Sequence, residues 1–177
     1  DLAEAKPYTD LKEFFGKEKL DAIVVATPPH LHLLPTQMAA ERGIQVFCEK
    51  PMAGSVEDCD AMIDACDRNK VILFIAFKHR YAKAFAYLKQ NLGRMGKPLW
   101  AVYSYPLWRI GDPGWKFIGG AIKGIIVENM VHAIDVLRYL MGDAERIYGE
   151  TNTGVAFNYA TWPDSAVFTF RFKNGAI

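Results

Sequence analysis

The sequence of 177 residues contains little cysteine, no long apolar run and almost no net charge. Its three cysteines, Cys48, Cys59 and Cys66, are an odd number without the spacing of a metal site, so we expect no metal centre. Cys59 and Cys66 lie seven residues apart in a helical pattern, which indicates a packing role for both. The sparse cysteines fit a reducing compartment and predict a cytoplasmic protein.

The 21 basic and 20 acidic side chains leave a formal net charge of +1. The two signs are interspersed, which argues against a broad nucleic-acid-binding surface. No apolar run approaches the roughly 20 residues that a membrane-spanning helix needs, so we expect no membrane partner. The chain opens with Asp1 and a mixed polar stretch, which lacks the pattern of a signal peptide.

A glycine-rich turn of the form GxGxxG is also absent, although the first half of the chain has the order of an α/β fold. Short apolar runs typical of strands alternate with segments of helical spacing. The expected strands are 21–26, 44–48 and 71–76, and the expected helices are 11–15, 31–42 and 56–69. Strands and helices in this order form βαβ units and build a parallel sheet. The continuous run DAIVVA predicts a strand that is covered on both faces.

In the second half the expected helices and strands no longer alternate regularly. This pattern predicts an α+β domain with an open, largely antiparallel sheet. Expected helices cover 82–92, ending at Gly93, and about 129–141, and expected strands cover 100–105, 146–151 and 165–172. Asn174-Gly175 is a hairpin turn signal close to Ile177, so we expect an incomplete sheet. These patterns place a partial Rossmann-like domain at 1–80 and a truncated second domain at 81–177.

Several motifs occur in one order along the chain. The stretch DAIVVATPPHLHLLPTQMAAERGIQVFCEKPMA joins an apolar strand ending in Ala-Thr-Pro, a His-x-His pair and a Glu-Lys-Pro tripeptide, and FKHRY and ENMVHAIDVLRYLMG follow it. Together they resemble the glucose–fructose oxidoreductase / inositol dehydrogenase / MocA family of NAD(P)-dependent oxidoreductases. This resemblance implies a two-domain protein about twice this length, so the chain would lack the first βαβ unit. We also expect a homo-oligomer formed through the second-domain sheet.

The tripeptide Glu49-Lys50-Pro51 ends an expected parallel strand, and open α/β sheets bind ligands at the carboxyl ends of their strands. The resemblance implies that Lys50 binds the substrate hydroxyl and relays its proton while hydride leaves for the nicotinamide. It also implies that Glu49 faces the nicotinamide ribose and that Pro51 fixes the turn, where a cis bond is an option. The alternative is a solvated loop with adjacent charges.

The segment after the long loop supplies the other half of the expected chemistry. His132 follows Glu128 by four residues, a spacing that puts both side chains on one helix face. The resemblance implies that His132 is the catalytic acid/base and Glu128 a substrate ligand, although the commoner family residue at the latter position is Asp. The alternative is a buried, hydrogen-bonded histidine on an amphipathic helix. Asp135 is interpreted as structural.

Cofactor contacts are implied on two further segments. The resemblance places Thr27, Pro28 and His32 near the nicotinamide, although a histidine at a helix start also caps or packs. Lys78 and Arg80 follow the third expected strand, where they contact the cofactor or form a surface basic cluster.

The long loop at 108–124 carries two candidate substrate ligands, Arg109 and Trp115. Aromatic and basic side chains together suit a polyhydroxylated ring, and loops of this length are often functional. Anchoring of the loop by its tryptophans is the alternative.

Three hypotheses follow for the protein. The first is an oxidoreductase that uses NAD or NADP to oxidise or reduce a sugar, cyclitol or related polyol. The second is a non-catalytic NAD(P)-binding regulator, which would need neither Lys50 nor the Glu128 and His132 pair. The third is that this polypeptide alone is an inactive fragment, because the cofactor pyrophosphate normally binds at a glycine-rich turn.

Overall fold

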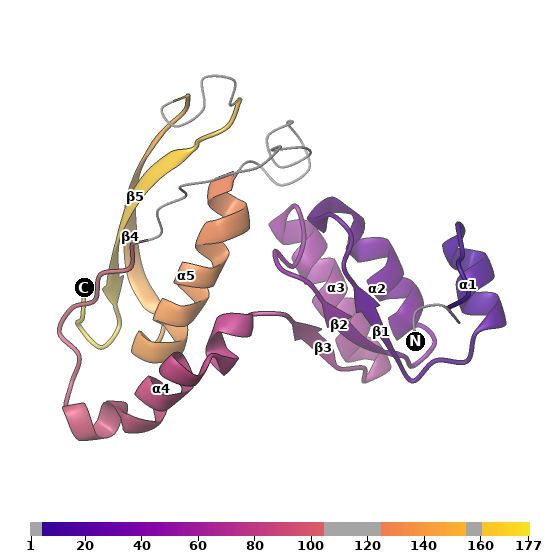
Figure 1. The fold of residues 1–177 in the computed structure, drawn as a ribbon, viewed down its shortest axis with the longest axis horizontal. Coiled ribbons are helices and arrows are strands. Elements are labelled where there is room, and N and C mark those ends of the chain that lie inside the picture. The colour runs from indigo at the N-terminus through magenta and orange to yellow at the C-terminus, as the bar shows by residue number, and fades with distance from the viewer. Residues whose placement is uncertain (1–4, 105–124, 155–160) are drawn as a thin grey trace. The chain divides into compact units, whose positions relative to one another are not determined.

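The computed structural model describes residues 5–104, 125–154 and 161–177 (Figure 1). The chain divides into two compact units, Asp1–Ala76 and Phe77–Ile177. Each unit has a hydrophobic cluster of its own. Within the described residues, no helix combines the length and the apolar character that crossing a membrane requires.

The first unit alternates strands and helices, as the sequence pattern predicts. Its elements are α1 (Leu11–Lys17), β1 (Ala22–Val25), η2 (Pro29–Leu31, a 3-10 helix), α2 (Leu33–Ala40), β2 (Gln45–Cys48), α3 (Val56–Asn69) and β3 (Leu73–Ile75). The strands are parallel in the order β1-β2-β3, and α2 and α3 lie side by side (Figure 1). The prediction of a Rossmann-like parallel sheet is therefore confirmed.

The two faces of this sheet differ, and here the expectation of strands covered on both faces is wrong for the described structure. Val25 is 4% exposed whereas its neighbour Val24 is 71% exposed. Alternate residues point to opposite faces of a strand, so a continuous apolar run cannot reveal which face is covered. On the open face Phe47 stacks on Phe74 of the neighbouring strand with ring centroids 5.1 Å apart.

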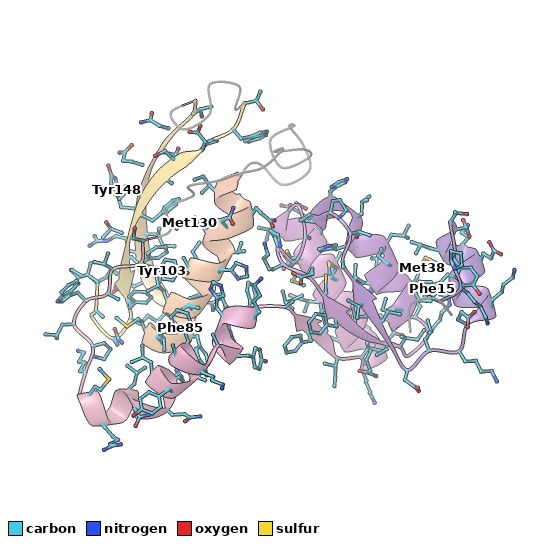
Figure 2. The ribbon with its side chains drawn as sticks, viewed as in Figure 1. Phe15, Met38, Phe85, Tyr103, Met130 and Tyr148 are labelled. Carbon is cyan, nitrogen blue, oxygen red and sulfur yellow. The ribbon has the colours of Figure 1, made fainter. Side chains whose placement is uncertain are left out.

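Helices and sheet bury one apolar cluster in the first unit. Its fully buried members include Val46 and Cys48 of β2 and Met62 of α3. Phe15 of α1 joins the cluster, and Met38 of α2 packs against it (Figure 2). Each fully buried apolar side chain of this size contributes about 1.5–3 kcal/mol to folding, so the cluster fixes the three helices on the sheet.

The second unit begins with two helical segments and ends in a hairpin. Its elements are η3 (Lys78–Tyr81, a 3-10 helix), α4 (Lys83–Met95), α5 (Ile125–Met141), β4 (Ala144–Asn152) and β5 (Ser165–Phe172). β4 and β5 are antiparallel, and α5 packs against β5 (Figure 1). The predicted antiparallel sheet of the second half is confirmed.

Two boundaries in the second unit differ from those predicted. Gly93 does not end α4, because a glycine with ordinary helical angles is tolerated inside a helix. The helix ends at Met95 and is followed by Gly96, which has φ +86°. The predicted strand at 100–105 is absent over residues 100–104. Instead, the Ala101 amide donates to the Ile177 carbonyl oxygen at 2.9 Å, and the Ile177 amide donates to the Leu99 carbonyl oxygen at 3.1 Å.

The hairpin contains two positions where glycine is required. A Cβ on Gly149 would lie 2.5 Å from a ring carbon of Phe168, its direct partner across the strands. The aromatic ring therefore covers the glycine, a pairing that fixes the register. Gly175 has φ +87°, and its amide donates to the Phe172 carbonyl oxygen at 2.8 Å, which confirms the predicted turn.

The boundary of α3 yields the first testable prediction. The Ser55 hydroxyl accepts a hydrogen bond from the Asp58 amide at 3.1 Å and caps the helix. Replacing Ser55 by Ala leaves that amide without its acceptor, so we expect the free energy of unfolding of the first unit to fall by about 1 kcal/mol. Urea denaturation followed by far-ultraviolet circular dichroism measures the change.

Ser55→Asp is the matched control, because a carboxylate oxygen also caps a helix and complements its dipole. An unchanged free energy of unfolding in Ser55→Ala would show that the cap contributes nothing, and Ser55→Asp should keep the wild-type stability.

Candidate functional site

One group of candidate residues, in the first unit, lies at the carboxyl edge of the parallel sheet. Thr27 and Pro28 follow β1, and Glu49, Lys50 and Pro51 follow β2. The Glu49 amide donates to the Val25 carbonyl oxygen at 2.8 Å, which extends the pairing of the two strands to their ends. Both loops therefore start from one sheet edge, where open α/β sheets bind their ligands.

His32 holds these two loops together. Its side chain is 0% exposed, and its Nε2 atom donates to the Thr27 carbonyl oxygen at 2.6 Å. Its Nδ1 atom lies 3.1 Å from the Met52 carbonyl oxygen and 3.3 Å from Cys48 Sγ. When Nδ1 carries a hydrogen it donates to the Met52 carbonyl oxygen, and when it carries none it accepts a hydrogen bond from the Cys48 thiol. The predicted cofactor contact of His32 stays a prediction. In the structure its ring holds the loop at Thr27 next to the loop at Met52.

The side chains after β2 differ in exposure. Pro51 is buried, whereas Glu49 and Lys50 are half-buried. The Lys50 amide donates to Glu49 Oε2 at 3.1 Å, so the carboxylate folds back on its own loop. The Lys50–Pro51 peptide bond is cis. Thr27 is exposed and Pro28 is half-buried at the neighbouring loop, so polar groups from both loops reach the surface at this edge.

A separate group of candidate residues, in the second unit, lies on one stripe of α5. Glu128 and His132 are 8% and 5% exposed, and Asp135 is 7% exposed. Together with Tyr139 these residues recur every three or four positions, so they lie on one helix face. Glu128 and His132 thus share a face, as their spacing predicts.

The opposite face of α5 is apolar and lines a cavity next to β5. Met130, Ala133 and Leu137 face a cavity of about 590 Å³ that residues 100–104 and β5 also line (Figure 2). Met130 of α5 and Tyr103 both contribute to its wall. The helix therefore separates an apolar side toward the sheet from a polar stripe that carries the candidate acid/base.

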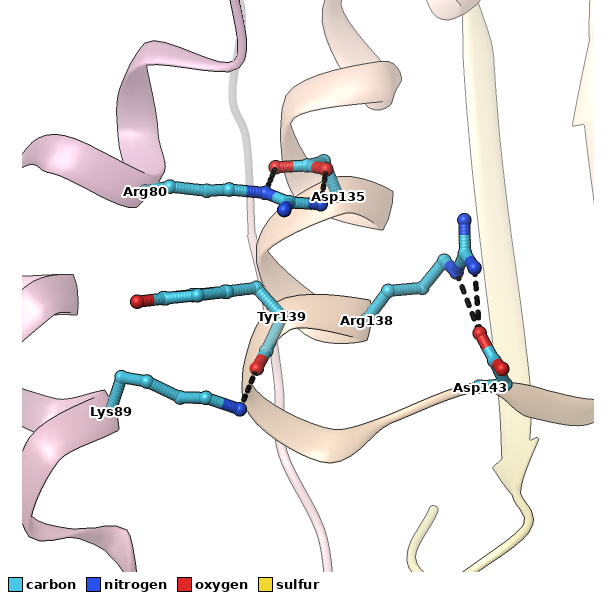
Figure 3. A network of polar contacts seen from close by, with 6 residues as sticks. All are labelled: Arg80, Lys89, Asp135, Arg138, Tyr139 and Asp143. Atoms are coloured by element: carbon cyan, nitrogen blue, oxygen red, sulfur yellow. Dashed lines mark hydrogen bonds and ion pairs between the residues drawn. The ribbon is translucent and has the colours of Figure 1, made fainter. Parts of the chain in front are cut away.

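The polar stripe is held by η3. Arg80 donates from Nε to Asp135 Oδ2 at 2.8 Å and from a terminal nitrogen to Asp135 Oδ1 (Figure 3). Its guanidinium also lies 5.3 Å from the centre of the Tyr139 ring. The hydrogen bonds to Asp135 raise the pKa of Arg80 above its ordinary value, although partial burial opposes the shift. The interpretation of Asp135 as structural matches this pairing.

The remaining predicted site residues belong to η3 and to the segment 108–124. Lys78 is exposed on η3, whereas the Arg80 side chain is 40% exposed and engaged with Asp135. Arg109 and Trp115 lie outside the described residues. Within the described residues, no cluster of three or more His, Cys, Asp or Glu side chains could hold a metal ion.

One contact of the stripe was not foreseen. The His79 ring stacks on the His132 ring, with centroids 4.3 Å apart and planes inclined by 21°. The sequence offered one clue, because His79 directly precedes an arginine and follows an expected strand. Its partner is more than fifty residues away, so no local pattern links the two rings.

Comparison with known proteins identifies both units. Residues 1–77 match the family model described as an oxidoreductase family with an NAD-binding Rossmann fold, and residues 88–177 match the GFO/IDH/MocA C-terminal domain. These matches confirm the resemblance drawn from the motifs. They also confirm, for this family, the predicted nicotinamide cofactor.

Two curated relatives illustrate the range of similarity. The chain is 30% identical over 181 residues to myo-inositol 2-dehydrogenase of Thermotoga maritima, covering 99% of this chain and 53% of that protein. It is 36% identical over 138 residues to 2,7-anhydro-N-acetylneuraminate hydratase of Mediterraneibacter gnavus, covering 76% and 37%. The chain thus spans about half or less of the length of these relatives.

A solved structure shows the same architecture. The WlbA dehydrogenase from Bordetella pertussis, crystallised with NADH and UDP-GlcNAcA, matches with a TM-score of 0.84 and 28% identity. The match covers 97% of this chain and 51% of that chain.

The buried thiol beside His32 gives a second prediction. Burial, followed by the charge of Glu49, raises the pKa of Cys48 to about 12. At pH 8 the thiolate fraction is then about 10⁻⁴, against about a quarter for an ordinary thiol. We expect iodoacetamide to alkylate Cys48 at least about 100-fold more slowly in the folded protein than in denaturant, measured by peptide mass spectrometry.

The same shift has a consequence for stability. Because the folded state binds the thiol proton more tightly, the contribution of Cys48 is present below the ordinary thiol pKa of about 8.5 and is lost as the pH rises toward 12. Rapid alkylation of Cys48 at pH 8, under conditions where circular dichroism shows a folded protein, would contradict the buried position of this thiol.

Proposed function

Because the chain belongs to the GFO/IDH/MocA oxidoreductase family, we propose that the protein transfers hydride between NAD or NADP and a sugar, cyclitol or related polyol. The single observation that carries the proposal is the buried pair of Glu128 and His132 on one face of α5. Their spacing puts a carboxylate and an imidazole next to each other on one helix face, an arrangement that suits binding a hydroxyl and taking its proton.

The carboxyl edge of the parallel sheet supports the cofactor assignment from its own residues. Thr27 is exposed there, and Glu49 and Lys50 are half-buried on the neighbouring loop. Donors and acceptors at this edge suit a ribose and an amide, and His32 holds the two loops that present them. We assign Thr27, Pro28, Glu49 and Pro51 to cofactor binding, with Lys78 as a further candidate.

The residues of the chain would divide the chemistry as follows. The Lys50 ammonium donates a hydrogen bond to the reacting hydroxyl oxygen, and the His132 imidazole takes the proton of that hydroxyl. Glu128 accepts a hydrogen bond from a neighbouring hydroxyl and so orients the ring. The bound nicotinamide supplies the chemistry of accepting the carbinol hydrogen with its electron pair, and a carbonyl group remains on the substrate.

Substrate class follows from the same groups. A lysine, a glutamate and a histidine bind several hydroxyls at once, and we assign Arg109 and Trp115 to the remaining edge and face of the ring. Relatives support this class, because one is named a myo-inositol 2-dehydrogenase. Myo-inositol and D-glucose are therefore suitable first substrates in a screen that follows NADH formation.

The roles are tested by substitution in each unit. We expect Lys50→Ala and His132→Ala each to lower kcat by about 10²–10⁴-fold, because the first removes the hydrogen-bond donor to the reacting oxygen and the second removes the base that takes its proton. The Kd for NADH, measured by nicotinamide fluorescence, should change by only about threefold or less, because neither residue is assigned to cofactor binding.

Lys12→Ala is the matched control, since Lys12 is an exposed lysine of α1 far along the chain from the motif. It should leave both kcat and Kd unchanged. Full turnover in Lys50→Ala or His132→Ala would refute the assigned role of that residue.

A further inference from the structure

Three rings from three separate elements form one stack in the second unit. His79 of η3 lies between Phe85 of α4, with centroids 6.0 Å apart, and His132 of α5, with centroids 4.3 Å apart. The planes are inclined by 22° and 21°, so each ring presents its face to the next. Figure 2 labels Phe85 on α4 beside η3 and α5. The candidate acid/base therefore belongs to a stack of rings.

The neighbouring residue fixes where this stack forms. Arg80 directly follows His79 and is bonded through two nitrogens to Asp135, one turn beyond His132 (Figure 3). The Arg80 guanidinium also lies over the Tyr139 ring, one further turn along α5. Two consecutive residues of η3 thus contact positions 132, 135 and 139, which form a single stripe of the helix. The contacts of Arg80 therefore fix the backbone next to His79 against this stripe.

The polar edge of His79 does not explain the contact. Its Nδ1 atom is shut off from solvent and has no hydrogen-bond partner among the described residues. An unpaired buried nitrogen costs free energy, so Nδ1 does not stabilise this position, whereas the face of the ring packs against two other rings. An imidazole rotates about two side-chain bonds, and a second ring pressed against its face limits that rotation.

We infer that His79 is a positioning residue for His132, whose flat ring holds the His132 imidazole in the orientation that proton transfer requires. This inference rests on the proposed function of His132 as the acid/base. Proton transfer depends steeply on geometry, and a misplacement of about 1 Å can cost about 10²-fold in rate. His79 needs no contact with substrate or cofactor to exert this effect.

The test compares side chains of similar size with and without a flat face. His79→Leu removes the ring, and we expect kcat to fall about 10–100-fold while the Kd for NADH changes less than about twofold. His79→Phe keeps a flat ring and should retain kcat within about threefold. Both variants are measured with NAD⁺ and the polyol that reacts fastest in the wild-type screen, with circular dichroism melting as the folding control.

The kcat values of these variants show whether the ring face of His79 positions His132. Unchanged kcat in His79→Leu, or an equal loss in His79→Phe, would overturn it, since either result shows that the ring face is not what matters. If His79→Leu does not fold, Phe85→Leu replaces it, because it removes only the outer ring and should lower kcat about 3–10-fold; an unchanged kcat there also overturns the inference. Full turnover in His132→Ala would instead refute the proposed function, which separates the two failures.

Discussion

Burying a polar side chain costs free energy unless the side chain is paired, and this constraint shapes both units of the protein. In the first unit the fully buried His32 ring binds the backbone of two loops, at Thr27 and Met52. In the second unit the buried Asp135 carboxylate binds Arg80 through two hydrogen bonds. Breaking a buried ion pair costs about 3–5 kcal/mol, and less for Arg80 because its side chain is 40% exposed.

These two contacts hold the backbone of the segments that carry the candidate functional residues, and Lys50, Glu128 and His132 themselves take no part in them. His32 ties together the loops that carry Thr27 and Lys50. The Arg80 and Asp135 pair holds η3 against the stripe of α5 that carries Glu128 and His132. In both units a buried polar contact holds the backbone of the segments that carry the candidate residues.

The sequence predicted the type of nearly every described element, because period and capping are local properties. Val56–Asn69 was predicted with both boundaries correct, since Ser55 caps one end and Lys70 adopts a left-handed conformation at the other. Gly93 was misread as a helix end, because only the backbone angle distinguishes it from Gly96. The open face of β1 was missed because neighbouring elements, not the strand's own residues, decide coverage. The predicted site residues came from motifs, whereas the His79 and His132 stack depends on tertiary contact between distant segments.

The most direct test of the central claim follows hydrogen from carbon to cofactor. Myo-inositol, or the polyol that reacts fastest, is deuterated at its carbinol carbons and incubated with the protein and NAD⁺, and nuclear magnetic resonance detects deuterium at C4 of the nicotinamide. The account predicts one deuterium in each NADH formed, with the transfer strongly reduced in His132→Ala. Tight binding of NAD⁺ without deuterium transfer from any polyol tested, as expected of a regulator, would contradict it.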